Sequence, residues 1–349
     1  MTTPPDPPSG PHRRRPRYKG THPRRFEERY KELAGDPDEV AHVLAKGRTP
    51  AGTHVPIMVA EVLAALAPAP GERAVDVTLG HGGHAQRLLE RVLPGGRLLA
   101  LDTDPIELPR TEARLRALGY DEPSLVVRRA NFAGLPAALA SVGWEDGADV
   151  LLADLGLSSM QIDDPVRGFT FGAEGPLDMR MNPQRGVSAA QWLERVSVPD
   201  LVAALRDNAD EPHAEAVAEA LARRRGHLAT TQDLADAVRA AVAALVPEDE
   251  TDDSVRRVFQ AVRIEVNDEF GALDTLLRAL PWCVRPGGRV AFLSFHSGED
   301  RSVKKAFQAG ERDGTWAEVA PEVVRATPEE RRANPRSRPA KLRWARRAG

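Results

Sequence analysis

The sequence has 349 residues and only one cysteine, Cys283. A single thiol excludes a disulfide within the chain and a metal site built from several thiolates, and no metal site is expected. No stretch approaches the roughly 20 consecutive apolar residues that a membrane-spanning helix needs. The first residues are polar and rich in proline, without the apolar segment of a secretory signal. These absences predict a cytoplasmic protein with no membrane partner.

The formal net charge of -3 gives no general attraction for nucleic acid, but the basic residues are unevenly placed. Residues 13–25 contain seven arginines and lysines and no acid, and residues 325–347 contain nine against two glutamates. Clusters of this kind are typical of contacts with phosphates. For residues 13–25, a solvated tail without a partner remains an alternative.

From residue 54 onward the chain alternates between helical spacing and short apolar runs. Strands are predicted over residues 73–78, 96–102, 124–129 and 149–154, and helices over 56–67, 85–92, 106–118 and 135–142. Short apolar strands separated by helices indicate a parallel sheet covered on both faces. Residues 1–50 lack this pattern, apart from a short helical patch at 26–33, and are predicted to be a flexible, basic, proline-rich extension.

The pattern changes after residue 154. A loop rich in glycine and aspartate is followed at 188–245 by a segment rich in alanine and leucine at helical spacing, with no strand signal. The α/β pattern then resumes, with a helix over 268–280, a turn at 286–288, a strand over 289–295 and a last edge strand over 341–346. We therefore predict a Rossmann-like α/β domain, residues 51–186 and 260–349, interrupted by an all-helical subdomain at 187–259.

A glycine-rich turn, DVTLGHGGH at residues 76–84, follows the first predicted strand. Glycine lets the backbone approach a ligand closely, and the next helix offers free N–H groups to an anion. Gly80, Gly82 and Ala85 also fit the loose dinucleotide-binding motif. The turn alone therefore does not distinguish a nicotinamide dinucleotide from S-adenosylmethionine.

Two further positions suit the adenosine that both cofactors contain. Asp102 ends the second predicted strand, twenty residues after Gly82, where a carboxylate can accept hydrogen bonds from both ribose hydroxyls. A cap or turn residue is the alternative for Asp102, although Asp104 is better placed as the helix cap. Phe132, beyond the third strand, is placed near the adenine, with a core aromatic as the alternative.

The fourth predicted strand ends on Asp154 and leads into a loop of hydroxyls and an amide, at the edge of the sheet where ligands bind. This segment, LADLGLSSMQIDD at 152–164, resembles the RsmH (MraW) family of bacterial rRNA methyltransferases. Further blocks resemble the same family: GPLDMRM at 175–181, RVFQAVRIEVNDE at 257–269, SFHSGEDR at 294–301 and NPRSR at 334–338. The resemblance extends from residue 54 to residue 346 and is far more specific than one glycine-rich turn.

The resemblance implies a Rossmann-like class I S-adenosylmethionine-dependent methyltransferase that acts in rRNA processing in the cytoplasm. In this family the methyl group passes from S-adenosylmethionine to the exocyclic N4 of a cytosine in small-subunit (16S) rRNA, so this rRNA or the 30S particle is the expected partner. The family's cofactor site falls here on Gly82, Gly83, His84, Asp102, Phe132, Asp154 and Gln161. Whether the chain is a monomer or a homodimer stays open.

The chemistry of this reaction suggests which side chains act on the base. The exocyclic amine of cytosine is a poor nucleophile because its lone pair is delocalised into the ring. Acceptors must hold its N–H groups, and a carboxylate or an imidazole can take the proton released after transfer. The predicted catalytic residues are Asp154, Ser158, Ser159, Asp178 and His296. A structural histidine is the alternative for His296, and an ion pair with Arg180 is the alternative for Asp178.

A base that is paired and stacked cannot reach such a pocket, so the target cytosine must be exposed or flipped. The predicted phosphate contacts are Arg180, Arg185, Arg223, Arg224, Arg225, Arg256, Arg257, Arg336 and Arg338, with the helical subdomain as a wall around the RNA. The chain departs from the family at residues 209–212, which read ADEP in place of a Gly-Glu-Glu stretch, and at Gly298 in place of a leucine.

Two other classes of function remain open at this point. One is a non-catalytic factor that binds S-adenosylmethionine and RNA during ribosome assembly. The other is a nicotinamide-dependent oxidoreductase, which the turn around Gly80 allows but none of the later blocks supports.

Overall fold

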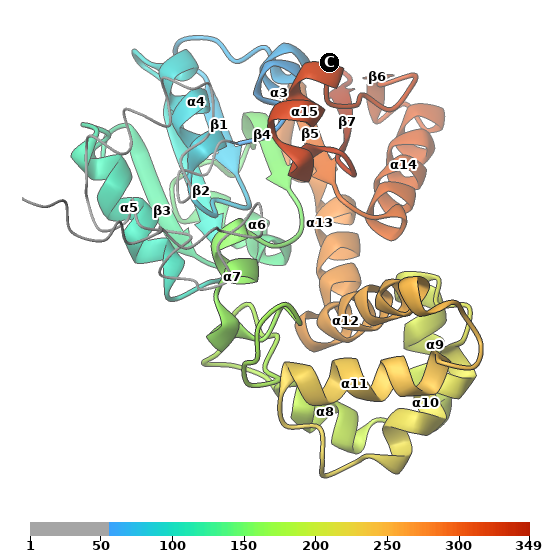
Figure 1. Ribbon diagram of the computed structural model, residues 1–349. Coiled ribbons are helices and arrows are strands. Elements are labelled where there is room, and N and C mark those ends of the chain that lie inside the picture. The colour runs from blue at the N-terminus through green and yellow to red at the C-terminus, as the bar shows by residue number, and fades with distance from the viewer. Residues whose placement is uncertain (1–55) are drawn as a thin grey trace, which may run out of the picture.

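The computed structural model describes residues 56–349, and the predicted extension 1–50 with its helical patch lies outside the described residues. Figure 1 shows two parts, a sheet flanked by helices and a lobe of helices beside it. Within residues 56–349 no helix combines the length and the apolar character needed to span a membrane.

A seven-stranded sheet organises the first part, with the strand order β3-β2-β1-β4-β5-β7-β6. The strands are β1 (Arg73–Asp76), β2 (Arg97–Asp102), β3 (Leu125–Arg129), β4 (Ala148–Asp154), β5 (Val284–Ser294), β6 (Trp316–Val319) and β7 (Lys341–Arg347). Strands β1 to β5 pair in parallel, whereas β7 runs antiparallel to both β5 and β6. The predicted Rossmann-like α/β fold is confirmed.

The prediction that residues 341–346 form the edge strand is wrong. β7 lies between β5 and β6, so β6 is the edge of the sheet. β6 escaped prediction because it has only four residues, of which Ala317 and Glu318 are exposed, and so it carries no continuous apolar run. The predicted turn at 286–288 is part of β5, whose pairing with β4 is irregular there.

Helices cover both faces of the sheet (Figure 1). They are α3 (Val59–Leu66), α4 (Gly83–Val92), α5 (Glu107–Ala117), α6 (Leu135–Ala140), α13 (Glu269–Cys283) and α14 (Ser297–Arg312). The first three pack on one face with Leu98 and Ala100 of β2, and the last three pack on the other face with Leu99 and Leu101. Successive residues of β2 are thus buried on opposite faces, which explains why the strand is an unbroken apolar run in the sequence.

The lobe contains α8 (Ala189–Arg195), α9 (Val198–Ala209), α10 (Ala214–Arg223), α11 (Thr231–Val242) and α12 (Thr251–Asn267). These helices share a hydrophobic cluster separate from the two clusters of the sheet. The side chains of Ser188, Ser197 and Thr230 cap α8, α9 and α11 by accepting backbone N–H groups of the first turn. The predicted boundary at residue 259 falls within α12, which leads through Asp268 alone into α13.

Candidate active site

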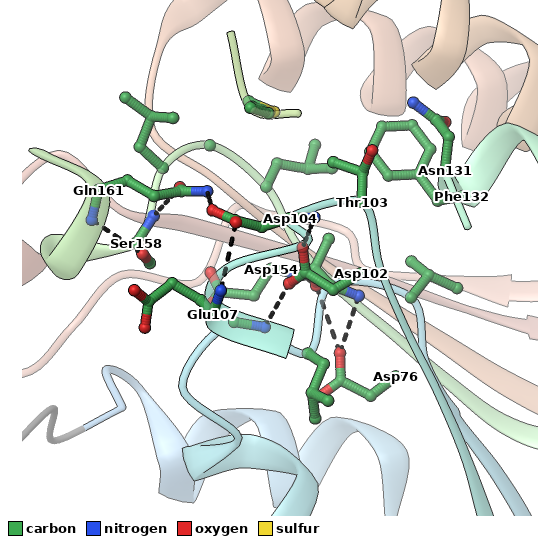
Figure 2. A pocket seen from close by; sticks show the side chains of 18 of the residues that line it. Asp76, Asp102, Thr103, Asp104, Glu107, Asn131, Phe132, Asp154, Ser158 and Gln161 are labelled. Carbon is green, nitrogen blue, oxygen red and sulfur yellow. Dashed lines mark hydrogen bonds between the residues drawn. The ribbon is translucent and has the colours of Figure 1, made fainter. Parts of the chain in front are cut away.

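A pocket lies at the carboxyl ends of β1, β2 and β4, where parallel sheets bind their ligands (Figure 2). The seven residues predicted to hold the cofactor all line this pocket: Gly82, Gly83, His84, Asp102, Phe132, Asp154 and Gln161. The geometry therefore brings together side chains that the sequence spreads over 80 positions.

Only some of the five residues predicted for catalysis lie at the pocket. Asp154 and Ser158 line the pocket, whereas Asp178 and His296 are not among its lining residues. Ser159 is the first residue of α7 (Ser159–Asp163), and its side chain lies outside the described part of the structure.

The glycine-rich turn is built so that only glycine fits at its end. Gly82 has a φ of 74°, and a Cβ atom there would lie 2.8 Å from Cγ2 of Thr111. The hydroxyl of Thr111 donates to the carbonyl of Gly80 at 2.7 Å and fixes the turn from the side of α5. The backbone can therefore approach a ligand at the start of α4.

The carboxylate of Asp102 holds the loops at the pocket and keeps acceptor positions for a ligand. Its two carboxylate oxygens accept backbone N–H groups, Oδ2 from Gly80 at 2.7 Å and Oδ1 from Asp104 at 2.9 Å. Burial raises the pKa of Asp102, and these two hydrogen bonds oppose that shift. A carboxylate has about four acceptor positions. The remaining ones fit two ribose hydroxyls, so the turn role and the ribose role are compatible.

Phe132 begins a short 3-10 helix at the edge of the pocket, capped by the side chain of Asn131 (Figure 2). The ring is partly buried against the hydrophobic cluster under α6 and α13 and also lines the pocket. Its place suits both stacking beside an adenine and closing the core.

Asp154 ends β4 and faces the centre of the pocket. Its backbone N–H donates to Oγ1 of Thr78 at 2.6 Å, and its Oδ2 lies 3.8 Å from Nε2 of His84. Its Oδ1 is buried and finds no hydrogen-bond partner among residues 56–349. Burial raises the pKa of Asp154 to about 8, and the negative charges of Asp76 and Glu299 add to the shift. At neutral pH the free protein therefore keeps a proton on this carboxyl group.

Asp76 lies behind Asp154 and is 1% exposed. Burial raises its pKa to about 7, although hydrogen bonds from the backbone and hydroxyl of Thr78 oppose the shift. The carboxyl group is thus neutral in the folded protein over a range of pH in which the unfolded chain would be ionised.

This difference predicts that Asp76 destabilises the protein increasingly as pH rises. A raised folded pKa favours folding fully only below the unfolded value of 3.8, and the advantage is lost as pH climbs to about 7. The slope is about 1.4 kcal/mol per pH unit within that window. In Asp76→Asn the amide oxygen can still accept both hydrogen bonds from Thr78. We expect its Tm relative to the wild type to rise between pH 5 and 7.5, measured by calorimetry; parallel Tm profiles would contradict a buried neutral Asp76.

Ser158 and Gln161 form the capping box of α7. The hydroxyl of Ser158 accepts from the backbone of Gln161 at 3.3 Å, and Oε1 of Gln161 accepts from the backbone of Ser158 at 3.0 Å. Nε2 of Gln161 donates to Oδ2 of Asp104 at 2.7 Å (Figure 2). Gln161 thus joins the loop after β4 to the loop after β2, and the hydroxyl hydrogen of Ser158 remains available as a donor.

Asp178 is paired with Arg180, and His296 lies beside Phe270 and Glu299. Both oxygens of Asp178 accept from the guanidinium of Arg180, at 2.8 and 2.7 Å, and this pairing holds the pKa of Asp178 below its usual value although partial burial opposes it. His296 precedes α14, with its ring 5.7 Å from that of Phe270 and its Nε2 3.3 Å from Oε1 of Glu299.

Glu299 is a pocket residue that the sequence did not single out. It is 4% exposed, and its Oε2 accepts the backbone N–H of Phe295 at 2.9 Å. Burial pushes its pKa upward, but His296, the N–H of Phe295 and the charge of Arg263 outweigh burial, so the pKa of Glu299 is lowered. Its place in the SFHSGEDR block, directly after the strand next to β4, was the available signal. Asp154, which is partly buried, and Glu299, which is buried, are therefore two carboxyl groups whose pKa values are shifted in opposite directions.

The pocket fits S-adenosylmethionine by the chemistry of its side chains. Asp102 offers acceptors to a ribose, and the ring of Phe132 offers an apolar face to an adenine. Glu299, whose pKa is lowered, puts a negative charge on the inner wall that suits the positive charge of a sulfonium. The start of α4 offers backbone N–H groups to a carboxylate.

Comparison with known proteins identifies the family. The family model described as the MraW methylase family matches residues 51–348. The Ribosomal RNA small subunit methyltransferase H 2 of Alkaliphilus metalliredigens is 48% identical, over 95% of this chain and 97% of the relative. The Ribosomal RNA small subunit methyltransferase H 1 of Lachnoclostridium phytofermentans is 44% identical, over 96% of this chain and 93% of the relative. The chain therefore belongs to the MraW methylase family, and the predicted methyltransferase activity with S-adenosylmethionine as its cofactor is confirmed.

Proposed function

We propose that this protein transfers a methyl group from S-adenosylmethionine to the exocyclic N4 of a cytosine in small-subunit (16S) rRNA, in the 30S particle and in the cytoplasm. The names of the relatives support the choice of RNA. The observation that carries the choice of an amine is the carboxyl group of Asp154, which lines the pocket at the end of β4 and is 23% exposed there. An acceptor in that place can hold an N–H group of the base and direct the nitrogen lone pair at the methyl donor.

The roles in the pocket follow from this position. Gly82, Gly83, His84, Asp102, Phe132 and Gln161 hold the cofactor, directly or by fixing its loops. Asp154 accepts a hydrogen bond from the exocyclic N–H of the cytosine and takes up the proton that the amine releases. The Ser158 hydroxyl donates a hydrogen bond to the base. Asp178 and His296 support neighbouring segments through Arg180 and Glu299.

The helical subdomain at 187–259 is proposed to form the wall that clasps the RNA. Several of the arginines predicted to bind phosphate have partners within the chain, among them Arg180 with Asp178 and Arg336 with Asp163. Arg185, Arg224 and Arg338 are exposed, and they are the preferred phosphate contacts.

The test is to incubate the purified protein with labelled S-adenosylmethionine and 30S subunits that lack the modification, and to analyse the nucleosides by mass spectrometry. N4-methylcytidine in the small-subunit rRNA is the expected product. Naked 16S rRNA and large subunits are the matched substrates that define the particle. Tight cofactor binding without methylation of any of these RNAs would favour the non-catalytic assembly factor instead.

A further inference from the structure

A buried ion pair joins the loop after β2 to the 3-10 helix Pro165–Arg167, which follows α7. Nη1 of Arg167 donates to Oδ2 of Asp104 at 2.7 Å, and the two residues are 5% and 1% exposed. Charges this deeply buried are tolerated only when each has a full set of partners. The partners of the two residues therefore show which segments the pair holds.

On one side, Asp104 belongs to the cofactor loop. Its backbone N–H donates to Oδ1 of Asp102, the carboxylate placed to hold the ribose. Its Oδ1 caps α5 by accepting the backbone N–H groups of Ile106 and Glu107 at 2.8 and 3.2 Å. Any group that fixes Asp102 therefore also fixes the backbone that positions Asp104.

On the other side, Arg167 holds the segment 179–181. Its Nη2 donates to the carbonyls of Arg180 and Met181 at 3.1 and 2.8 Å, and its own carbonyl accepts the N–H of Met179 at 3.1 Å. Asn267 completes this arrangement, since its Oδ1 accepts the N–H of Met181 at 2.7 Å and its Nδ2 donates to the carbonyl of Met179 at 2.8 Å.

The conformation of this segment depends on those contacts. Met179 is fully buried and has a φ of 60°, a left-handed conformation that a side chain other than glycine adopts at a cost. Met181 and Asn267 line the pocket. A side chain that holds Met179 and Met181 therefore shapes the wall against which the substrate would lie.

We infer that Arg167 is a positioning residue that transmits occupancy of the cofactor site to segment 179–181, so that the cofactor and the RNA bind cooperatively. The part concerning RNA rests on the proposed function. The path runs from Asp102 through Asp104 and Arg167 to Met181, and each step is a hydrogen bond or an ion pair. Such coupling is reciprocal, so RNA raises the affinity for the cofactor by the same factor.

The first test needs no RNA. Hydrogen exchange of the backbone amides of residues 179–181 is measured with and without saturating S-adenosylhomocysteine. We expect the cofactor analogue to slow these amides at least ~5-fold in the wild type. In Arg167→Lys the ammonium can pair with Asp104 but cannot also reach two carbonyls as a planar fork does, so the effect should vanish. Equal slowing in Arg167→Lys and the wild type would overturn the inference.

A matched control variant is Arg289→Lys. Arg289 likewise joins a carboxylate, Glu72, to two backbone carbonyls, those of Leu66 and Ala67, but it lies outside the pocket. This variant should keep the wild-type response to the analogue. If Arg167→Lys does not fold, Asn267→Ala tests the far end of the same path and should also lose the response.

The second test measures the dissociation constant of unmodified 30S subunits with and without the analogue. We expect the analogue to tighten binding ~5-fold or more in the wild type and in Arg289→Lys, and less than ~2-fold in Arg167→Lys. If the subunits bind equally well with and without the analogue, the inferred coupling is wrong, whereas the proposed function is not affected. Absence of subunit binding together with a normal exchange response would count against the proposed RNA substrate alone.

Discussion

Asp154→Asn should lower the rate of methyl transfer by a factor of about 10² to 10⁴, because the amide can still occupy the site but can no longer take the proton of the amine. The wild-type rate should also depend on pH through this residue. Since the pKa of Asp154 is about 8 in the free protein, kcat/KM for the RNA should rise with pH up to about 8 and then level off. The measurement is single-turnover methylation of 30S subunits between pH 6 and 9.

Two comparisons make this prediction specific. Asp149→Asn changes a carboxylate near the opposite end of the same strand, where Oδ2 accepts the N–H of Arg73, and it should leave the rate unchanged. The cofactor dissociation constant of Asp154→Asn, measured by calorimetry, should change far less than its rate. A variant with wild-type turnover, or with the wild-type pH profile at a reduced rate, would remove Asp154 from the proton transfer.

Asp102→Ala should raise the dissociation constant of S-adenosylmethionine about 100-fold. Hydrogen bonds to a charged group contribute about 1.5–3 kcal/mol each, and the substitution removes those to the ribose. It also releases the backbone N–H groups of Gly80 and Asp104 that hold the glycine-rich turn. Isothermal titration with the cofactor measures the effect directly.

Asp102→Asn separates the two contributions to this effect. Its amide oxygen can hold one of the two backbone N–H groups, so its affinity should fall between those of the wild type and Asp102→Ala. Asp146→Ala removes an exposed carboxylate paired with Arg73 and should bind the cofactor normally. If Asp102→Ala also bound normally, the carboxylate would serve only the turn, which was the alternative interpretation of this residue.

The first four strands could be predicted because both of their faces are buried. Val75, Leu99, Val126 and Leu151 belong to continuous apolar runs, and such runs are visible in the sequence. The order of the last strands could not be predicted, since it depends on pairing between segments far apart in the chain. A short edge strand such as β6, half exposed, leaves almost no signal.

The candidate site, too, could be predicted from the sequence only in part. The positions of Asp102 and Asp154 follow from the rule that ligands meet the carboxyl ends of parallel strands. The partners of these residues do not follow from any spacing. Arg167 and Asp104 are 63 residues apart, and only the folded chain shows that they form a buried pair. Glu299 becomes significant only because α14 begins just after β5, the strand beside β4, and buries a carboxylate whose charge acts on Asp154.

The lobe is connected to the sheet domain by a very short link between α12 and α13. One residue, Asp268, separates the two helices, in a left-handed conformation with a φ of 49°. The first residues after Asp268 are Glu269 and Phe270, and both line the pocket. Because α12 ends where the pocket wall begins, a change in the direction of α12 would displace Glu269 and Phe270 in that wall.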